Sequence, residues 1–365
     1  MDGTLPTAVA GAVLGLLAGA LLQRTHYCFM GAVSDWALFG GLRRLRAWML
    51  AAGLGVLGTH ALFLFTGLPR EDVPHLSGPV FWLGPVAGGL VFGFGMVLAG
   101  GCPSRDLVRA ASGSARALLA VLLVAVSAGA TMAGVLAPLY GWLRAVGTLP
   151  TEVPASLPDL LAAAGLPQAG VVVPLVSGGA LVAAALADPA LRRPGPELAA
   201  GLGLGLLVVA GYAVTGLLLY DPFEPRPVVS LAYVGPSART LWWLAVEGGL
   251  PSFGAALVLG TLAGAFLSAR ARGELRFEGF ADRADALRHA TGGILMGLGG
   301  TLAMGCTVGQ GLSGLSTLSL ASLLAVTAIV AGARLALAWL AAGSPLPRLF
   351  STSSHTPART GGPRP

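Results

Sequence analysis

The chain has three cysteines, and two of them occupy matching places in an internal repeat. Cys102 and Cys306 lie in Gly-rich segments, residues 88–113 and 292–314, that align without a gap at an offset of 204. The same offset places Ala232 where an earlier segment has the third cysteine, Cys28. Repeat-related positions indicate that the thiols share one chemical role. The matching glycines of the repeat are Gly88, Gly89, Gly93 and Gly95 in the first copy and Gly292, Gly293, Gly297 and Gly299 in the second.

Each cysteine precedes a short segment that could form a half-helix, with glycine or another small residue soon after it. The free N–H groups and positive dipole end at the start of such a helix suit an anion. A thiol adds a soft contact and a weak S–H donor. The pattern therefore favours a sulfur-containing anion over a hard anion such as sulfate. The alternative is that these cysteines are small buried hydrophobes, as single membrane cysteines commonly are.

Other residues near the cysteines are further candidates. Thr307 and Gln310 could bind an anion through a hydroxyl and an amide, or equally satisfy backbone groups of their own loop. Arg105 could attract an anion to the cytoplasmic mouth of a pathway, or act only as a topology-setting charge. Met30 and Met304, each two residues from a cysteine, leave a soft-metal site open, because thiolate and thioether ligands select Cu(I). We expect no cofactor and no resident metal.

The composition indicates an integral membrane protein. Hydrophobic residues make up 55% of the 365 residues and charged residues only 10%, whereas soluble domains are about one quarter charged. Several apolar runs reach the roughly 20 residues that a membrane-spanning helix needs. The net charge of +6 comes from arginines in short connections, so we expect no nucleic-acid partner. The N-terminus lacks the basic start of a cleavable signal peptide.

The apolar runs predict an all-α protein with nine spans, at residues 8–23, 45–67, 80–101, 115–137, 170–187, 198–220, 249–269, 289–305 and 317–342. Connections on one side contain 17 arginines and those on the other side contain 4. The arginine-rich side is therefore expected to be cytoplasmic. The N-terminus is then outside and the C-terminus inside. Residues 344–365 are expected to form a disordered tail.

The repeat and the orientation together predict two inverted, pseudo-symmetric halves. The Cys102 copy lies at a cytoplasmic junction and the Cys306 copy at an outer junction, so residues 1–169 and 197–343 form the halves and residues 170–196 connect them. Inverted repeats are typical of secondary transporters, which bind substrate at the repeat interface. Residues 24–44 and 227–248 are amphipathic and interrupted by Gly or Pro, which predicts short re-entrant helices.

Three motifs, RTHYCFMGAVSDW, GGCPSRDLVR and GCTVGQGLSGLSTLS, resemble those of the YeeE/YedE family, also called the sulfur transport family. The resemblance covers nearly the whole chain. It implies nine spans in the bacterial cytoplasmic (inner) membrane, with Cys28, Cys102 and Cys306 contacting a sulfur anion in succession. It also implies uptake of thiosulfate or a related sulfur anion, with selenium handling proposed for some members. A small cytoplasmic sulfur carrier of the TusA type is a possible partner.

Two other functions remain open beside a permease for thiosulfate or a related anion. A membrane sulfurtransferase would pass sulfane sulfur from a Cys persulfide to a cytoplasmic carrier, but no His or Lys lies beside Cys102 or Cys306 in sequence to generate the thiolate. A soft-metal permease would use the thiols and methionines. We expect a transporter and not an enzyme. The predicted substrate-binding residues are Cys28, Cys102, Cys306, Thr307, Gln310 and Arg105.

Overall fold

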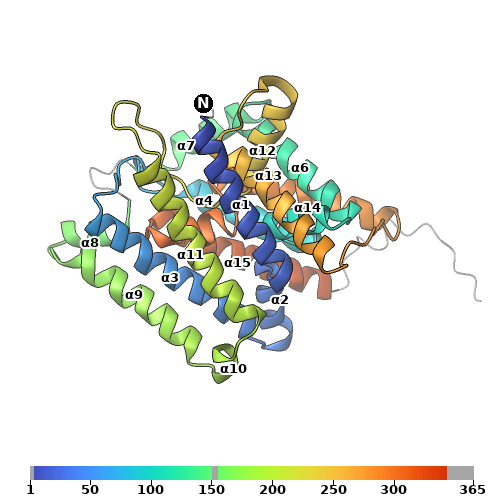
Figure 1. Ribbon diagram of the computed structural model, residues 1–365, viewed down its shortest axis with the longest axis horizontal. Helices are drawn as coiled ribbons and strands as arrows, with labels where there is room; N and C mark the ends of the chain where they lie inside the picture. The colour runs from blue at the N-terminus through green and yellow to red at the C-terminus, as the bar shows by residue number, and fades with distance from the viewer. Residues whose placement is uncertain (1–3, 150–154, 343–365) are drawn as a thin grey trace, which may run out of the picture.

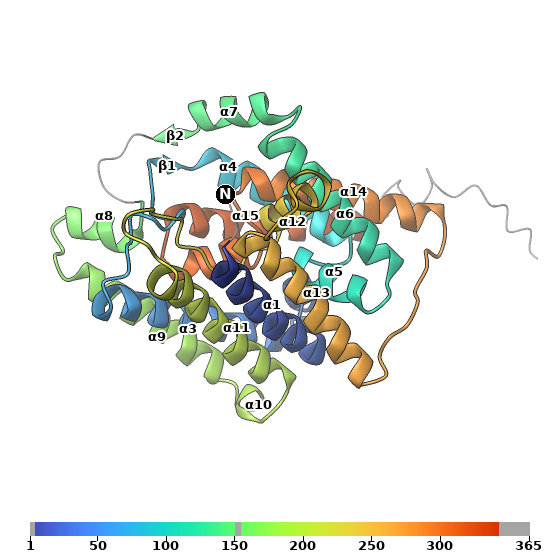
Figure 2. The same ribbon diagram turned by 45° about the horizontal axis from the view of Figure 1, so that its top comes forward.

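Nine long helices follow the nine predicted spans. The computed structural model describes residues 4–149 and 155–342; the predicted disordered tail lies outside these residues. Figures 1 and 2 show the long helices packed around a shared centre, with α9 at one edge beside α3. The nine helices are α1 (Leu5–Thr25), α3 (Arg43–Phe65), α4 (Leu83–Leu98), α6 (Ala115–Met132), α9 (Ala169–Leu186), α11 (Pro196–Ala213), α13 (Phe253–Ala271), α14 (Arg283–Leu302) and α15 (Leu320–Ala341).

The chain is a multi-pass, all-α membrane protein. In the described ranges, eight helical stretches are long and apolar enough to cross a membrane. Helix α14 is not among them, because its first two turns carry Arg283, Asp285 and Arg288. Its later turns contain the glycines of the repeat and pack between α4 and α6. The predicted eighth span is therefore a helix that depends mainly on packing against α4 and α6 for its position.

Several predicted span boundaries differ from the helix ends by a few residues, and the eighth helix begins at Arg283 where residue 289 was expected. The third span was expected from residue 80, but Val80–Phe81 form strand β1, which pairs antiparallel with β2 (Thr148–Leu149). The Trp82 amide also donates to the Gly147 carbonyl at 3.0 Å, so hydrogen bonds across the loops hold this stretch extended. The fourth span was expected to end at residue 137, but α6 ends at Met132 and a separate helix follows, α7 (Ala137–Val146).

Short helices fill the connections. Both segments that were predicted to be re-entrant contain one: α2 (Phe29–Phe39) and α12 (Val234–Trp242), the latter continued by the π-helix η2 (Trp243–Glu247). Each helix follows a non-helical lead-in, residues 26–28 and 219–233. The remaining short elements are α5 (Pro103–Ala111), α8 (Leu157–Ala163), α10 (Pro189–Arg192) and the π-helices η1 (Val214–Leu218) and η3 (Gly309–Gly314).

The long helices pair across the two copies of the repeat. Helix α1 packs on α13 and α11 packs on α3; likewise α4 packs on α15 and α14 packs on α6. In Figures 1 and 2, α1 and α13 run side by side. Each of these pairs joins a helix that precedes α9 to a helix that follows it. Helices from before and after α9 are therefore interleaved in one core.

Repeat-related glycines meet where α4 crosses α14. A Cβ added at Gly88 would lie 2.6 Å from the Gly299 carbonyl oxygen, and one added at Gly95 would lie 2.8 Å from that of Gly292. The offset of 204 relates Gly88 to Gly292 and Gly95 to Gly299. The same offset therefore converts each of these two contacts into the other. Such reciprocal contacts characterise a two-fold axis. Only residues without a side chain permit backbones to approach this closely in a membrane helix pair.

Candidate functional site

All three cysteines lie at the start of a helical segment, as predicted. Cys28 is the N-cap of α2, and Cys102 is the N-cap of α5, whose first turn begins with Pro103. Cys306 precedes η3, and its carbonyl oxygen accepts from the Gln310 amide at 2.7 Å. The short helices therefore present their unpaired N–H groups beside the thiols.

Cys28 and Cys102 form a pair at the convergence of two helix starts. Both line one narrow cavity and their thiols are neighbours. The sulfur of Cys102 faces the backbone N–H groups of Arg105, in α5, and Phe29, in α2. The Cys102 thiol also lies 3.3 Å from the Ser104 hydroxyl. The pair therefore combines two thiols with backbone donors from both helices.

The second copy of the repeat reproduces this arrangement with one thiol instead of two. The Cys306 sulfur accepts from the Gly309 amide at 3.3 Å and faces the Tyr233 amide. At the offset of 204, these residues correspond to Arg105 and Phe29 around Cys102. A Cβ built on Gly309 would lie 3.4 Å from the Ala232 Cβ and 3.8 Å from the Cys306 sulfur. Ala232 therefore occupies the place that Cys28 has beside Cys102.

The cavity at the cysteine pair is narrow. Its volume is about 10 Å³, about the least that holds one water molecule. Thr307 lines it beside Cys28 and Cys102, which brings three predicted residues together from distant parts of the chain. Cys306 is fully buried next to Thr307 and is not part of the lining. Two further residues of the lining, Tyr27 and Trp48, were not predicted.

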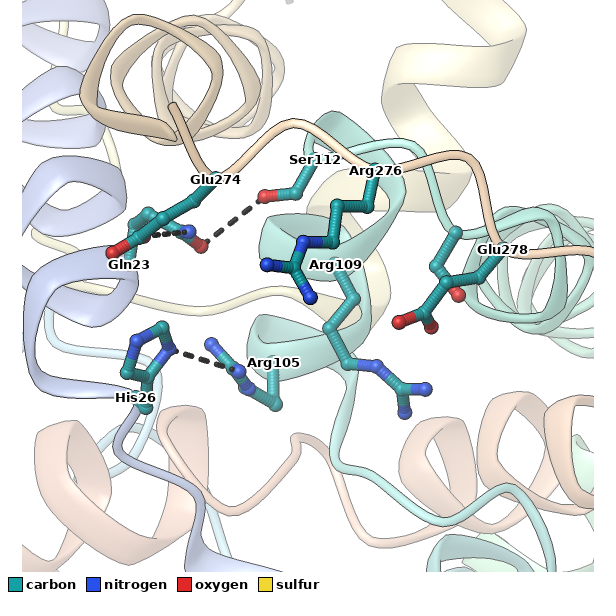
Figure 3. A pocket seen from close by; sticks show the side chains of 9 residues that line it. Gln23, His26, Arg105, Arg109, Ser112, Glu274, Arg276 and Glu278 are labelled. Carbon is teal, nitrogen blue, oxygen red and sulfur yellow. Dashed lines mark hydrogen bonds between the residues drawn. The ribbon is translucent and has the colours of Figure 1, made fainter. Parts of the chain in front are cut away.

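Arg105 belongs to a larger cavity of about 310 Å³ next to the cysteine pair. Figure 3 shows Arg105, Arg109 and Arg276 around this cavity, with His26 facing Arg105. Arg105 Nη2 lies 3.2 Å from His26 Nδ1. Arg105 is three residues after Cys102 and His26 two residues before Cys28, so both connect this cavity to the pair. We refer to it as the arginine vestibule.

The rim of the arginine vestibule is held by hydrogen bonds between distant segments. Gln23, in the last turn of α1, donates from Nε2 to Glu274 at 2.9 Å and accepts from Ser112 at 3.2 Å. Figure 3 shows this bridge on the side of the cavity away from Arg105. Glu274 and Glu278 also line the cavity and offset part of the arginine charge.

Gln310 lies outside both cavities. Its Nε2 donates to the Ala303 carbonyl at 2.8 Å, and its Oε1 accepts from the Ser322 hydroxyl. Gln310 is fully buried, so both ends of its amide are occupied by groups of the protein. These bonds hold the start of η3 against the end of α14 and the first turn of α15. The structure thus brings Cys28, Cys102 and Thr307 together and leaves Gln310 in a supporting position.

Tyr27 and Trp48 were missed for different reasons. Tyr27 is adjacent to Cys28 and could have been found from that neighbour alone. Trp48 lies in α3, in a predicted span where an aromatic residue is normally expected to pack in the hydrophobic core. It reaches the cavity because its ring packs on Phe29, at 5.3 Å between centroids. Only the packing of α3 against the start of α2 reveals this position.

Comparison with known proteins identifies similar chains. A family model described as "Sulphur transport" matches residues 24–335. The "Thiosulfate transporter TsuA" of Escherichia coli K12 is 28% identical over 321 residues, which are 83% of this chain and 86% of the relative. Its namesake from Spirochaeta thermophila is 28% identical over 335 residues, 84% of this chain and 90% of the relative. The "Probable transporter YedE" of E. coli is 33% identical over 103 residues, only 28% of this chain and 23% of the relative.

Proposed function

The chain belongs to the sulphur transport family, and on that premise we propose that it imports thiosulfate or a closely related sulfur anion along a pathway of three thiols. The observation that carries the proposal is the Cys28–Cys102 pair at the meeting point of the α2 and α5 N-termini. The repeat-related setting of Cys306 supports it. Two relatives that match more than four fifths of the chain are named as thiosulfate transporters.

The chemistry of the pair suits an anion with a terminal sulfur. Backbone N–H groups at helix starts stabilise negative charge. The thiols supply weak S–H donors and a polarizable surface, which match a sulfur atom better than a hard oxygen. Such S–H contacts form and break without covalent change, so the anion can move on. In this proposal the protein is a permease and not an enzyme.

The order of the sites follows from the proposed orientation. The arginine bias puts the arginine vestibule on the cytoplasmic side of the inner membrane and the Cys306 setting nearer the outside. An entering anion would then meet Cys306 first, the Cys28–Cys102 pair second and the vestibule last. The proposed halves, residues 1–169 and 197–343, meet along this route, with residues 170–196 as connector. A small sulfur carrier of the TusA type is a candidate recipient at the cytoplasmic mouth.

Uptake of radiolabelled thiosulfate into vesicles tests the substrate. Vesicles containing the protein should accumulate label above empty vesicles, and excess unlabelled thiosulfate should suppress the signal while sulfate should not. Sulfate is the informative competitor because it has the same charge and a similar shape but has a fourth oxygen in place of the terminal sulfur. If the protein transports no thiosulfate, or if sulfate competes equally well, the proposed substrate is wrong.

Intact-mass measurement separates transport from sulfur transfer. A permease leaves the three thiols unmodified after exposure to thiosulfate, because the anion passes without forming a bond to the protein. A gain of one sulfur atom during turnover would indicate a persulfide on a cysteine and would favour the sulfurtransferase.

A further inference from the structure

Three hydrogen-bond donors belong to residues that line the narrow cavity and have no partner among the residues that the structure describes. They are the Tyr27 hydroxyl, the Trp48 indole N–H and the Thr307 hydroxyl. The residues are 7%, 9% and 3% exposed, so bulk water does not reach them freely. All three line the cavity that contains Cys28 and Cys102. Buried polar groups without partners are uncommon in folded proteins, and three around one cavity indicate a site for a ligand.

The three donors come from different parts of the chain. Tyr27 lies in the break between α1 and α2, Trp48 lies in the second turn of α3, and Thr307 follows Cys306 ahead of η3. The Trp48 ring is fixed by Phe29 on one side, and its Nε1 would lie 3.5 Å from a Cβ built on Gly311. The donors are therefore positioned by packing of separate elements around the cysteine pair.

The chemistry of the donors selects one kind of partner. An indole N–H can only donate, so Trp48 requires an acceptor. A water molecule has only two lone pairs with which to accept, and the cavity holds about one water. The SO3 group of a thiosulfate-type anion presents three oxygens, each of which can accept from one of the three donors. The thiols of Cys28 and Cys102 are then left to face the rest of the anion.

We propose that Tyr27, Trp48 and Thr307 bind the oxygen atoms of the transported anion while Cys28 and Cys102 contact its terminal sulfur. This inference rests on the proposed function and extends it to the recognition of both ends of the substrate. It restricts the substrate to sulfur oxyanions that carry a terminal sulfur. Hydrosulfide lacks the oxygens, and a metal cation offers no acceptor to the three donors.

Neutral donors also fit a transport site better than a fixed charge would. Hydrogen bonds from neutral groups are weaker than those from arginine, so the anion can leave the cavity. Arg105 lies on the vestibule side. The cavity of about 10 Å³ must widen to admit an anion of this size.

The test uses substitutions that remove one donor each, and two of them hardly change the shape of the side chain. In Tyr27→Phe and Thr307→Val only the hydroxyl group is lost, and Trp48→Phe removes the indole N–H. Each should raise the KM for thiosulfate uptake about tenfold or more, since a hydrogen bond to an ionised group is lost. The matched controls Tyr140→Phe, Thr327→Val and Trp142→Phe lie outside both cavities and should leave the KM unchanged.

Thermal stability without substrate separates binding from a structural role. Removing a buried donor that has no partner should leave the melting temperature of Tyr27→Phe and Thr307→Val unchanged or raise it. Weaker uptake together with equal or higher stability supports the proposal. A lower melting temperature at unchanged KM would show that the donors only support the fold.

Failure of this inference can be told apart from failure of the proposed function. If the wild-type protein imports thiosulfate and all three variants keep its KM, the oxyanion site is wrong and the permease stands. Unlabelled hydrosulfide that competes as well as thiosulfate would also overturn the site, because it has no oxygens to bind. If the wild-type protein imports no thiosulfate at all, both proposals fall.

Discussion

Arg105 links the arginine vestibule to the thiol pair through its own backbone. Its amide faces the Cys102 sulfur, whereas its guanidinium extends into the vestibule toward His26. The Arg105 Nη1 atom is buried and has no partner among the described residues. A guanidinium with an unused donor next to a thiol-lined cavity is well placed to receive an anion leaving that cavity.

We expect Arg105→Gln to weaken transport without abolishing it. Loss of the charge lowers the local concentration of anions at the vestibule and removes part of the salt dependence of uptake. The KM should rise about threefold to tenfold at low salt and less at high salt. Arg144→Gln, an exposed change on α7, is the matched control. A variant with the wild-type KM and salt dependence would show that Arg105 contributes only to membrane topology.

At the residue scale, the sequence predicts the cysteines but not the site around them. Cys102 and Cys306 can be predicted as site residues because cysteine is rare in this chain and the two occupy matching positions of the repeat. Tyr27 and Trp48 carry no such signal, since an aromatic residue in an apolar segment usually packs. Gln310 shows the opposite case: a polar residue in a motif satisfies its hydrogen bonds within the protein. Which polar groups remain unpaired depends on tertiary packing.

At the scale of elements, the crossing of α4 and α14 depends on glycine. We expect Gly299→Ala to destabilise the protein by about 1–3 kcal/mol, the usual cost of inserting a methyl group into a tight core. The added Cβ would lie 2.6 Å from the Gly88 carbonyl oxygen. Because α14 is the least apolar of the nine long helices, it has little besides this packing to hold it. The variant should melt at a lower temperature in detergent.

Gly179→Ala is the control for this experiment. Gly179 is also inside a long helix, α9, but a Cβ built on it meets no atom within 4 Å. Alanine favours the helix over glycine, so this variant should melt at the wild-type temperature or slightly above it. Equal melting temperatures of the two variants would mean that the crossing of α4 and α14 accommodates an added methyl group and does not depend on glycine.

The elements themselves are largely predictable, because apolar length decides where a span lies. The nine long helices match the nine predicted spans, including α14, which was assigned from the repeat as much as from its hydropathy. The pairing of β1 with β2 and the helix α7 were not predicted. Strand β1 lies between α3 and α4, whereas α7 and β2 lie between α6 and α9, and the pairing of the two strands joins residues more than 60 positions apart.

At the scale of the whole molecule, the reciprocal glycine contacts explain how a symmetric fold holds an asymmetric site. The two copies of the repeat supply matching helix starts, one with Cys28 and Cys102 and the other with Ala232 and Cys306. Tyr27, Trp48 and Thr307 then break the symmetry around the first pair. The offset in the sequence predicts the axis, but only the packing shows which residues differ across it.

The orientation in the membrane predicts which connections face outward. Ser77→Cys, between α3 and α4, should react with a membrane-impermeant maleimide in right-side-out vesicles. Ala281→Cys, between α13 and α14, should react only after the membrane is permeabilised. Both residues are exposed, and the wild-type protein gives the background because its three cysteines are buried. The reverse pattern of labelling would contradict the arginine-based orientation and with it the proposed direction of import.

The most direct test of the central claim, that thiols carry the substrate, is thiosulfate uptake by Cys102→Ala. Cys102 belongs to the pair, faces amides from two helices and is 2% exposed. Ser268→Ala, a buried change in α13 outside both cavities, is the control for folding and membrane insertion. We predict that the Cys102 variant folds, inserts and loses at least nine tenths of the uptake that the control retains. Uptake equal to that of the control would contradict the proposal that the thiols form the transport pathway.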